Sequence, residues 1–164
     1  MKFSLDFACS TAKRLFGMNL IKIRKTVGRI LAIDYGKKRV GLAVSDPLKM
    51  IANGLTTVHP NELPDYLADY LGKENVETIV VGYPKQMNNQ DSESVEYIKP
   101  FLKKLKKQFP NVSVELEDER FTSSMAQDAM LQGGMKKKDR QNKANVDKIS
   151  ATIILQSFLE RKNQ

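Results

Sequence analysis

Two apolar segments joined by a short turn constrain the fold of this chain most strongly. Arg29–Asp34 (RILAID) is a short apolar run closed by an acid, and Arg39–Ser45 (RVGLAVS) shows the alternation of a β-strand. Both patterns are typical of strands, and the turn at 35–38 predicts that they form a hairpin. Leu55–Val58 is predicted as a third strand, so the sheet begins as an antiparallel meander.

The rest of the chain predicts crossover units that extend this sheet. Helical spacing over Glu62–Leu71 precedes a continuous apolar run, Glu77–Gly82 (ETIVVG), which suits a central strand covered on both faces. Further along the chain the patterns predict a helix from about Ser92 to Gln108 that Pro100 could kink, a strand over Val112–Glu117, a helix from Thr122 or Ser123 to Leu131, and a final helix from about Ala144 to Arg161. This order indicates an α/β fold, with a mixed sheet of antiparallel and parallel strands and helices on both faces.

Composition limits the chemistry that the chain can perform. The 164 residues are enough for one domain with a substantial core. Cys9 is the only cysteine and His59 the only histidine, so a disulfide framework, a zinc hydrolase site and a Ser-His triad all lack support. Any metal must therefore be held by oxygen, which favours Mg²⁺ or Mn²⁺. No apolar run approaches the ~20 residues that span a bilayer, and we expect a cytoplasmic protein.

The charge distribution suggests a polyanionic partner. The formal net charge is +8, and the basic residues are clustered. Residues 1–28 form a basic extension, and two further groups are Lys99, Lys103, Lys104, Lys106 and Lys107, and Lys136, Lys137, Lys138, Arg140, Lys143 and Lys148. Either group alone is equally compatible with a solvated face. Two groups flanking a carboxylate site favour nucleic acid over a small acidic substrate.

The basic extension over residues 1–28 has no continuous apolar segment and is a poor signal peptide. Its sequence is compatible with a flexible nucleic-acid-binding arm, with a short surface helix, or with translated upstream sequence before a start at Met18.

Acidic residues fall at the ends of two predicted strands. Asp34 ends the first strand, where α/β folds place ligands, although an aspartate there can also simply stabilise a turn. Asp118 and Glu119 end the last strand, where alternation puts Asp118 on the face of Val114 and Leu116. Glu119 takes the opposite face or the following loop, so either acid could reach a site.

Asp147 heads the apolar stripe of the final helix. Helical spacing places it on the same face as Ala151, Ile154, Leu155 and Phe158. The alternative role is that of an acid favoured by the helix dipole, with Asn145 as the cap. Because this face of the helix is expected to pack on the sheet, Asp147 should point inward, and this favours a role in a functional site. Three converging acids could hold two divalent ions, which activate water and stabilise the leaving oxygen in phosphodiester hydrolysis, and their mutual repulsion predicts that Mg²⁺ stabilises the protein.

Four motifs in order resemble those of the YqgF/RuvX family: Asp34–Asp46 (DYGKKRVGLAVSD), Val80–Pro84 (VVGYP), Asp118–Ser123 (DERFTS), and Lys143 with Asp147-Lys148. The resemblance covers roughly residues 29–160. It implies a ribonuclease H-like fold, related to Holliday-junction resolvases, and a nuclease domain over residues 29–164. It also implies a hydrolase that trims the 5′ end of precursor 16S ribosomal RNA.

The resemblance also assigns residues to the site. It carries the family's catalytic, metal-binding acids over to Asp34, Glu119 and Asp147, with Asp118 as a possible accessory acid. Residues 1–28 have no counterpart in the family, and Asn89 stands where members commonly have glycine.

Three basic residues are candidates for substrate binding. Arg39 and Arg120 could reach phosphates, which arginine binds in a bidentate manner, although Arg120 could instead pair with a neighbouring acid. Lys143, one turn before Asp147, could contact phosphate or simply be solvated.

The sequence leaves alternatives to a nuclease acting on precursor ribosomal RNA. A resolvase of four-way DNA junctions is the close variant, and a nucleic-acid-binding module without catalysis is the second. A sugar kinase or actin-like ATPase is disfavoured, because the chain has no residues for the second lobe that would enclose a nucleotide.

Overall fold

The computed structural model describes residues 28–84, 95–118 and 122–162. Its elements are β1 (Arg29–Tyr35), β2 (Val40–Ser45), β3 (Ala52–Val58), α2 (Leu63–Lys73), β4 (Val76–Tyr83), α3 (Val95–Gln108), β5 (Ser113–Asp118), α4 (Thr122–Gln132), α5 (Lys137–Arg140) and α6 (Lys143–Lys162). The order confirms the sequence prediction except for α5, which the sequence did not predict. A single turn of helix is too short to show helical periodicity. The predicted start of α3 at Ser92 and the loop around Asn89 lie outside the described residues.

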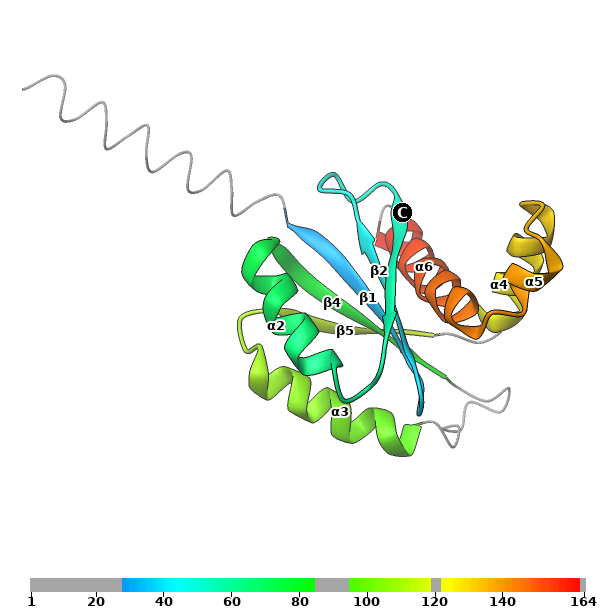
Figure 1. Ribbon diagram of the computed structural model, residues 1–164. Coiled ribbons are helices and arrows are strands. Elements are labelled where there is room, and N and C mark those ends of the chain that lie inside the picture. Colours follow the sequence, from blue (N-terminus) through cyan, green and yellow to red (C-terminus); the bar gives the residue numbers. More distant parts are fainter. Residues whose placement is uncertain (1–27, 85–94, 119–121, 163–164) are drawn as a thin grey trace, which may run out of the picture.

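The sheet is mixed, as predicted. Its five strands are arranged in the order β3-β2-β1-β4-β5 (Figure 1). The pairs β1/β2 and β2/β3 are antiparallel, whereas β1/β4 and β4/β5 are parallel. The carboxyl ends of β1, β4 and β5 therefore meet at one edge of the sheet, which is the edge where Asp34 and Asp118 lie.

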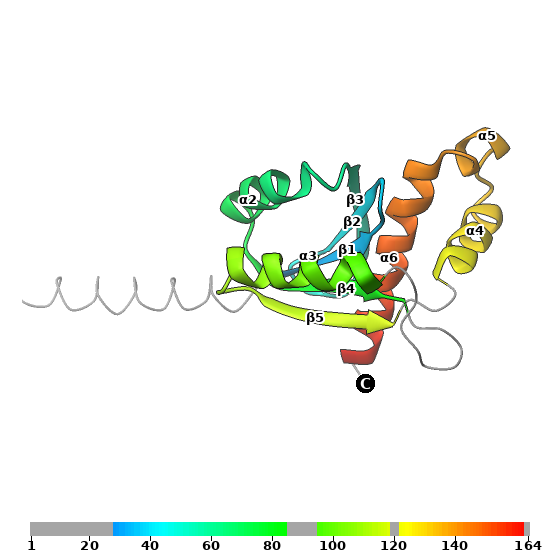
Figure 2. The ribbon, with the colours of Figure 1, turned by 90° about the horizontal axis from the view of Figure 1, so that it is seen from below.

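Helices cover both faces of the sheet. On one face, α2 and α3 pack against alternate residues of β1, such as Leu31 and Ile33. On the other face, α6 packs against the intervening residues Ile30 and Ala32. Helices α4 and α5 lie beside the first half of α6, on the side away from α2 and α3 (Figure 2). None of the helices in the described ranges is both long and apolar enough to cross a membrane.

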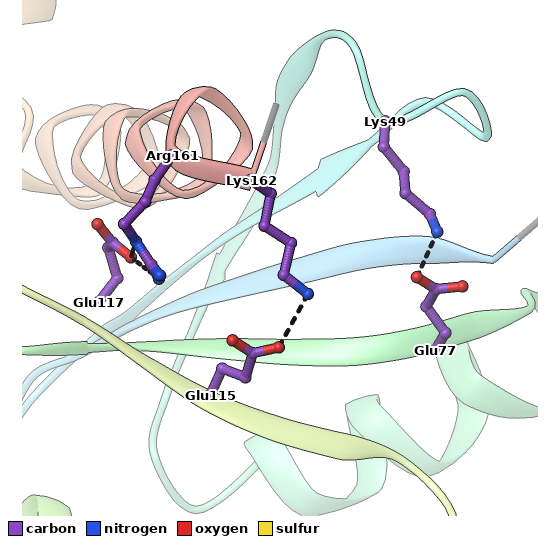
Figure 3. Close-up of polar contacts among 6 residues, drawn as sticks. All are labelled: Lys49, Glu77, Glu115, Glu117, Arg161 and Lys162. Carbon is purple, nitrogen blue, oxygen red and sulfur yellow. Dashed lines mark hydrogen bonds and ion pairs between the residues drawn. The ribbon is translucent and has the colours of Figure 1, made fainter. Parts of the chain in front are cut away.

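Helix α6 runs across one face of the sheet, from the edge strand β3 to the edge strand β5. Near its start, the hydroxyl of Thr57 on β3 donates to the carbonyl oxygen of Ala144 at 2.8 Å. At its end, Arg161 and Lys162 pair with acids of β5, the strand at the other edge of the sheet (Figure 3). Between these points the predicted stripe is buried, with Ala151, Ile154, Leu155 and Phe158 each no more than 1% exposed.

Candidate active site

Asp34 lies at the carboxyl end of β1, on the face that α6 covers. Residues 30 and 32 of the same strand pack on α6, and side chains alternate along a strand, so Asp34 shares their face. Its partner across the antiparallel pair is Gly41 of β2.

Gly41 allows α6 to approach the sheet at this point. A Cβ atom added to Gly41 would lie 2.0 Å from the backbone oxygen of Asp147, so no side chain fits there. The start of α6 thus rests directly on the strand beside Asp34. This packing brings Asp34 and Asp147, which are far apart in the sequence, to the same edge of the sheet.

The start of α6 agrees with the prediction of about Ala144, but the capping residue differs. The helix begins at Lys143, and the side-chain oxygen of Asn142 accepts a hydrogen bond from the backbone nitrogen of Ala144 at 3.0 Å. The prediction of Asn145 as the cap was wrong: its side chain instead donates to the carbonyl oxygen of Asp139 at 3.1 Å. Asp147 therefore lies beyond the first turn, where the helix dipole stabilises acids less.

The two carboxylates interact electrostatically. Burial, and next the negative charge of Asp147, raise the pKa of Asp34 to about 7. Asp147 is paired with Arg39, whose Nε lies 2.5 Å from its Oδ2. In the described part of the chain no salt bridge includes Asp34. Arg39 thus neutralises Asp147, whereas no ion pair within the described ranges brings a cation to Asp34.

The structure separates the two acids that end β5. Glu117 faces α6, because its carboxylate pairs with Arg161. By alternation Asp118 lies on the opposite face, that of α2 and α3, and away from Asp34. Glu119 and Arg120 lie outside the described residues. Within the described ranges no group of three or more histidine, cysteine or acidic side chains could hold a metal ion, so a third ligand would have to come from elsewhere in the chain.

A groove of about 700 Å³ opens beside Asp147 and contains two of the predicted substrate-binding residues, Arg39 and Lys143. It runs along the first turns of α6, where α4 and α5 contact that helix (Figure 1). The other lining residues are Gln127, Met130, Lys137, Arg140, Gln141 and Val146.

Only one of the two basic groups lies at this groove. Lys137, Arg140 and Lys143 come from the second basic group in the sequence. Lys137 and Arg140 were not predicted as substrate-binding residues, although their position in this cluster was a signal for that role. Lys106 and Lys107 belong to α3, which covers the opposite face of the sheet. The expectation that both groups flank the carboxylates is therefore wrong for this end of α3.

Comparisons with known proteins identify relatives of this chain. A family model described as "RuvX: Holliday junction resolvase" matches residues 28–161. A protein of Phocaeicola vulgatus named "Putative pre-16S rRNA nuclease" is 63% identical over 136 residues, which are 83% of this chain and 98% of that protein. A protein of the same name from Porphyromonas gingivalis is 54% identical over 138 residues, which are 84% of this chain and 100% of that protein.

Solved structures support the fold. RuvC of Thermus thermophilus, determined in complex with a Holliday-junction substrate, superposes with a TM-score of 0.51 at 18% sequence identity. The match covers 82% of this chain and 96% of RuvC. At this level of identity the similarity is one of fold, and it confirms the predicted ribonuclease H-like architecture.

Proposed function

Because the chain belongs to the RuvX family of nucleases, we propose that it is a metal-dependent hydrolase of phosphodiester bonds in precursor 16S ribosomal RNA. The observation that carries the proposal is the packing of Asp147 over Gly41, which places two carboxylates together beside a groove rich in cations. In metal-assisted hydrolysis of a nucleic-acid backbone, carboxylates hold the cation, and basic side chains can position the phosphate.

The residues present fit a hard divalent cation. Asp34 and Asp147 offer carboxylate oxygens, which Mg²⁺ and Mn²⁺ prefer, and Arg39 supplies too little positive charge for both acids. Asp34, Asp147 and, as the third acid, Glu119 would hold the metal. Bound there, it would lower the pKa of the attacking water and stabilise charge on the leaving oxygen.

The side chains of the chain have separate tasks in this proposal. Arg39 holds the carboxylate of Asp147 through its Nε, and its remaining guanidinium nitrogens are proposed to donate to a phosphate. Lys143 lies one turn before Asp147 in the groove and attracts the RNA backbone. Arg120 is proposed to contact phosphate as well. We place this machinery in a nuclease domain over residues 29–164, which excludes the basic extension.

A cleavage assay tests the proposal directly. The purified full chain is incubated with a precursor 16S fragment that carries its 5′ leader, with Mg²⁺ or with EDTA, and the RNA ends are mapped. We expect cleavage within the leader or at its junction with the mature sequence only when Mg²⁺ is present. Cleavage that continues in EDTA would contradict metal dependence, and RNA that is bound but left intact would indicate a binding module without catalysis.

Two variants control the assay for contaminating nucleases. Asp34→Asn, purified identically, is expected to be inactive. Asp69→Asn changes an exposed acid of α2 that pairs with Lys73 one turn along the same helix, and it is expected to cleave like the unmodified protein.

A four-way DNA junction is the second candidate substrate. The description of the matching family and the similarity in fold to RuvC favour it. Competition between a labelled RNA leader and an unlabelled junction, followed by cleavage of each alone, separates the two. Preferential cleavage of the junction would replace RNA with DNA while leaving the roles of Asp34 and Asp147 unchanged.

A further inference from the structure

One part of the groove beside Asp147 is lined by residues of α4, α5 and the start of α6. We propose that this part of the groove binds one unpaired nucleotide of the RNA, adjacent to the bond that is cut. The inference rests on the proposed function, because it assigns the substrate strand that the same site selects.

Three cations of this part of the groove have no acidic partner among the residues that the structure describes. Lys137 and Arg140 lie one turn apart on α5, and Lys143 begins α6. Among the described residues no carboxylate forms a salt bridge with any of the three, whereas Arg39, at the other end of the groove, is paired with Asp147. Three cations around one hollow, without acidic partners in the described ranges, favour an anionic ligand.

Arg140 has a specific unsatisfied donor. Its Nε is buried and has no hydrogen-bond partner in the structure. Leaving a buried polar group unpaired costs about 1–3 kcal/mol, and more when the group is charged. If the Arg140 side chain turned toward the groove that it lines, its guanidinium could donate to a phosphate oxygen and the cost would be removed, since arginine binds phosphate through two parallel N–H donors.

The remaining lining suits a base. Met130, only 2% exposed, and Val146 give the groove an apolar wall, and the amides of Gln127 and Gln141 supply donors and acceptors. The volume of about 700 Å³ is within the range of pockets that enclose a small molecule. A simple phosphate would leave this apolar part unfilled.

A paired base cannot enter such a groove, because in a duplex the bases are stacked inside and the phosphates face outward. Single-stranded RNA can turn a base out of the strand and place it against protein. Asp147 and Arg39 line the same groove, so the bound nucleotide would lie next to the reacting phosphate. The groove would therefore restrict cleavage to unpaired segments.

Binding measured in EDTA tests the inference without cleavage. The full chain is titrated against a fluorescent single-stranded RNA, the same strand in a duplex, and the same strand with abasic residues, and anisotropy is recorded. We expect Arg140→Gln to weaken single-strand binding about tenfold and Lys137→Gln about threefold, with changes below about twofold for the duplex. The abasic strand should bind the unmodified protein more weakly than the intact strand.

Lys106→Gln is the matched control, because it removes one exposed lysine from α3 on the other face of the sheet. Equal weakening of single-strand and duplex binding by Arg140→Gln would overturn the inference and leave only a phosphate contact. An unchanged affinity for the abasic strand would overturn it as well. Cleavage of the RNA leader by the unmodified protein in Mg²⁺ is scored separately, so failure of the groove and failure of the nuclease proposal are distinguishable.

Discussion

The carboxylates at the two ends of α6 differ in their ion pairing. At its carboxyl end, Arg161 donates to Glu117 through Nη2 at 2.7 Å and Nε at 3.2 Å, and Lys162 donates to Glu115 at 3.0 Å (Figure 3). Each acid of β5 that faces the helix thus has its own cation. At the other end, Arg39 pairs with Asp147, and Asp34 has no salt-bridge partner in the described part of the chain.

This difference separates structural acids from candidate catalytic acids. A carboxylate with its own cation is satisfied within the fold, and the contact with Glu117 also raises the pKa of Arg161. Asp34 is partly buried near the negative charge of Asp147, which is unfavourable for a protein without a ligand. Proteins keep such arrangements mainly where they serve binding or catalysis.

The largest expected effect is on activity. If Asp34 is a metal ligand as proposed, Asp34→Asn should lower the rate of Mg²⁺-dependent RNA cleavage on the order of a thousandfold, ~4 kcal/mol of transition-state stabilisation. Single-turnover rates at saturating protein measure the loss. Glu117→Gln changes an acid on the same face of the sheet, and its rate should stay within about threefold of the unmodified rate. A comparable loss of activity in both variants would contradict the distinction between structural acids and candidate catalytic acids.

The close packing of α6 on β2 gives the next largest effect. Gly41→Ala should lower the free energy of unfolding by about 3 kcal/mol, because its methyl group would overlap the backbone of Asp147. Gly72→Ala in α2 is the matched control, since its Cβ would meet no atom within 4 Å, and it should stabilise the helix by about 0.5–1 kcal/mol. Chemical denaturation measures both. An unaffected Gly41→Ala protein would show that α6 does not rest on this strand.

The raised pKa of Asp34 predicts a pH dependence in metal-free protein. Between the ordinary value of 3.8 and about 7, the unfolded chain releases this proton while the folded protein retains it. Stability contributed by this group is therefore lost as pH rises through that window, by at most about 1.4 kcal/mol per pH unit. Denaturation in EDTA, compared between the unmodified protein and Asp34→Asn, measures the difference. Parallel pH profiles for the two proteins would contradict the prediction.

The smallest effect is expected at the carboxyl end of α6. Arg161→Gln should lower the free energy of unfolding by about 1 kcal/mol or less, since the arginine is half exposed in its pair with Glu117, and should leave RNA cleavage unchanged. Thermal unfolding with and without added salt checks this, because salt should shrink the difference between the two proteins. A large loss of activity would place this end of α6 in the site.

Most of the fold could be predicted because its signals are local. The apolar run of β4, the alternation of β2 and β5 and the helical stripe below Asp147 each identify an element within a short segment. The family motifs added the expected partners of Asp34. The cap of α6 was missed because Asn142 and Asn145 are both suitable caps, and only the position of the helix start distinguishes them.

The sequence by itself determined the mixed sheet, the inward direction of Asp147 and the absence of cysteine or histidine clusters, because periodicity and composition are properties of the chain alone. Tertiary structure decided which acids meet. Alternation shows that Asp118 and Glu117 face opposite sides of β5, but only the placement of α6 shows which side holds Asp34. Arg39 and Asp147 are 108 positions apart in the sequence, and they meet because Gly41 has no Cβ atom to keep α6 away from the strand. No local pattern could reveal this pairing.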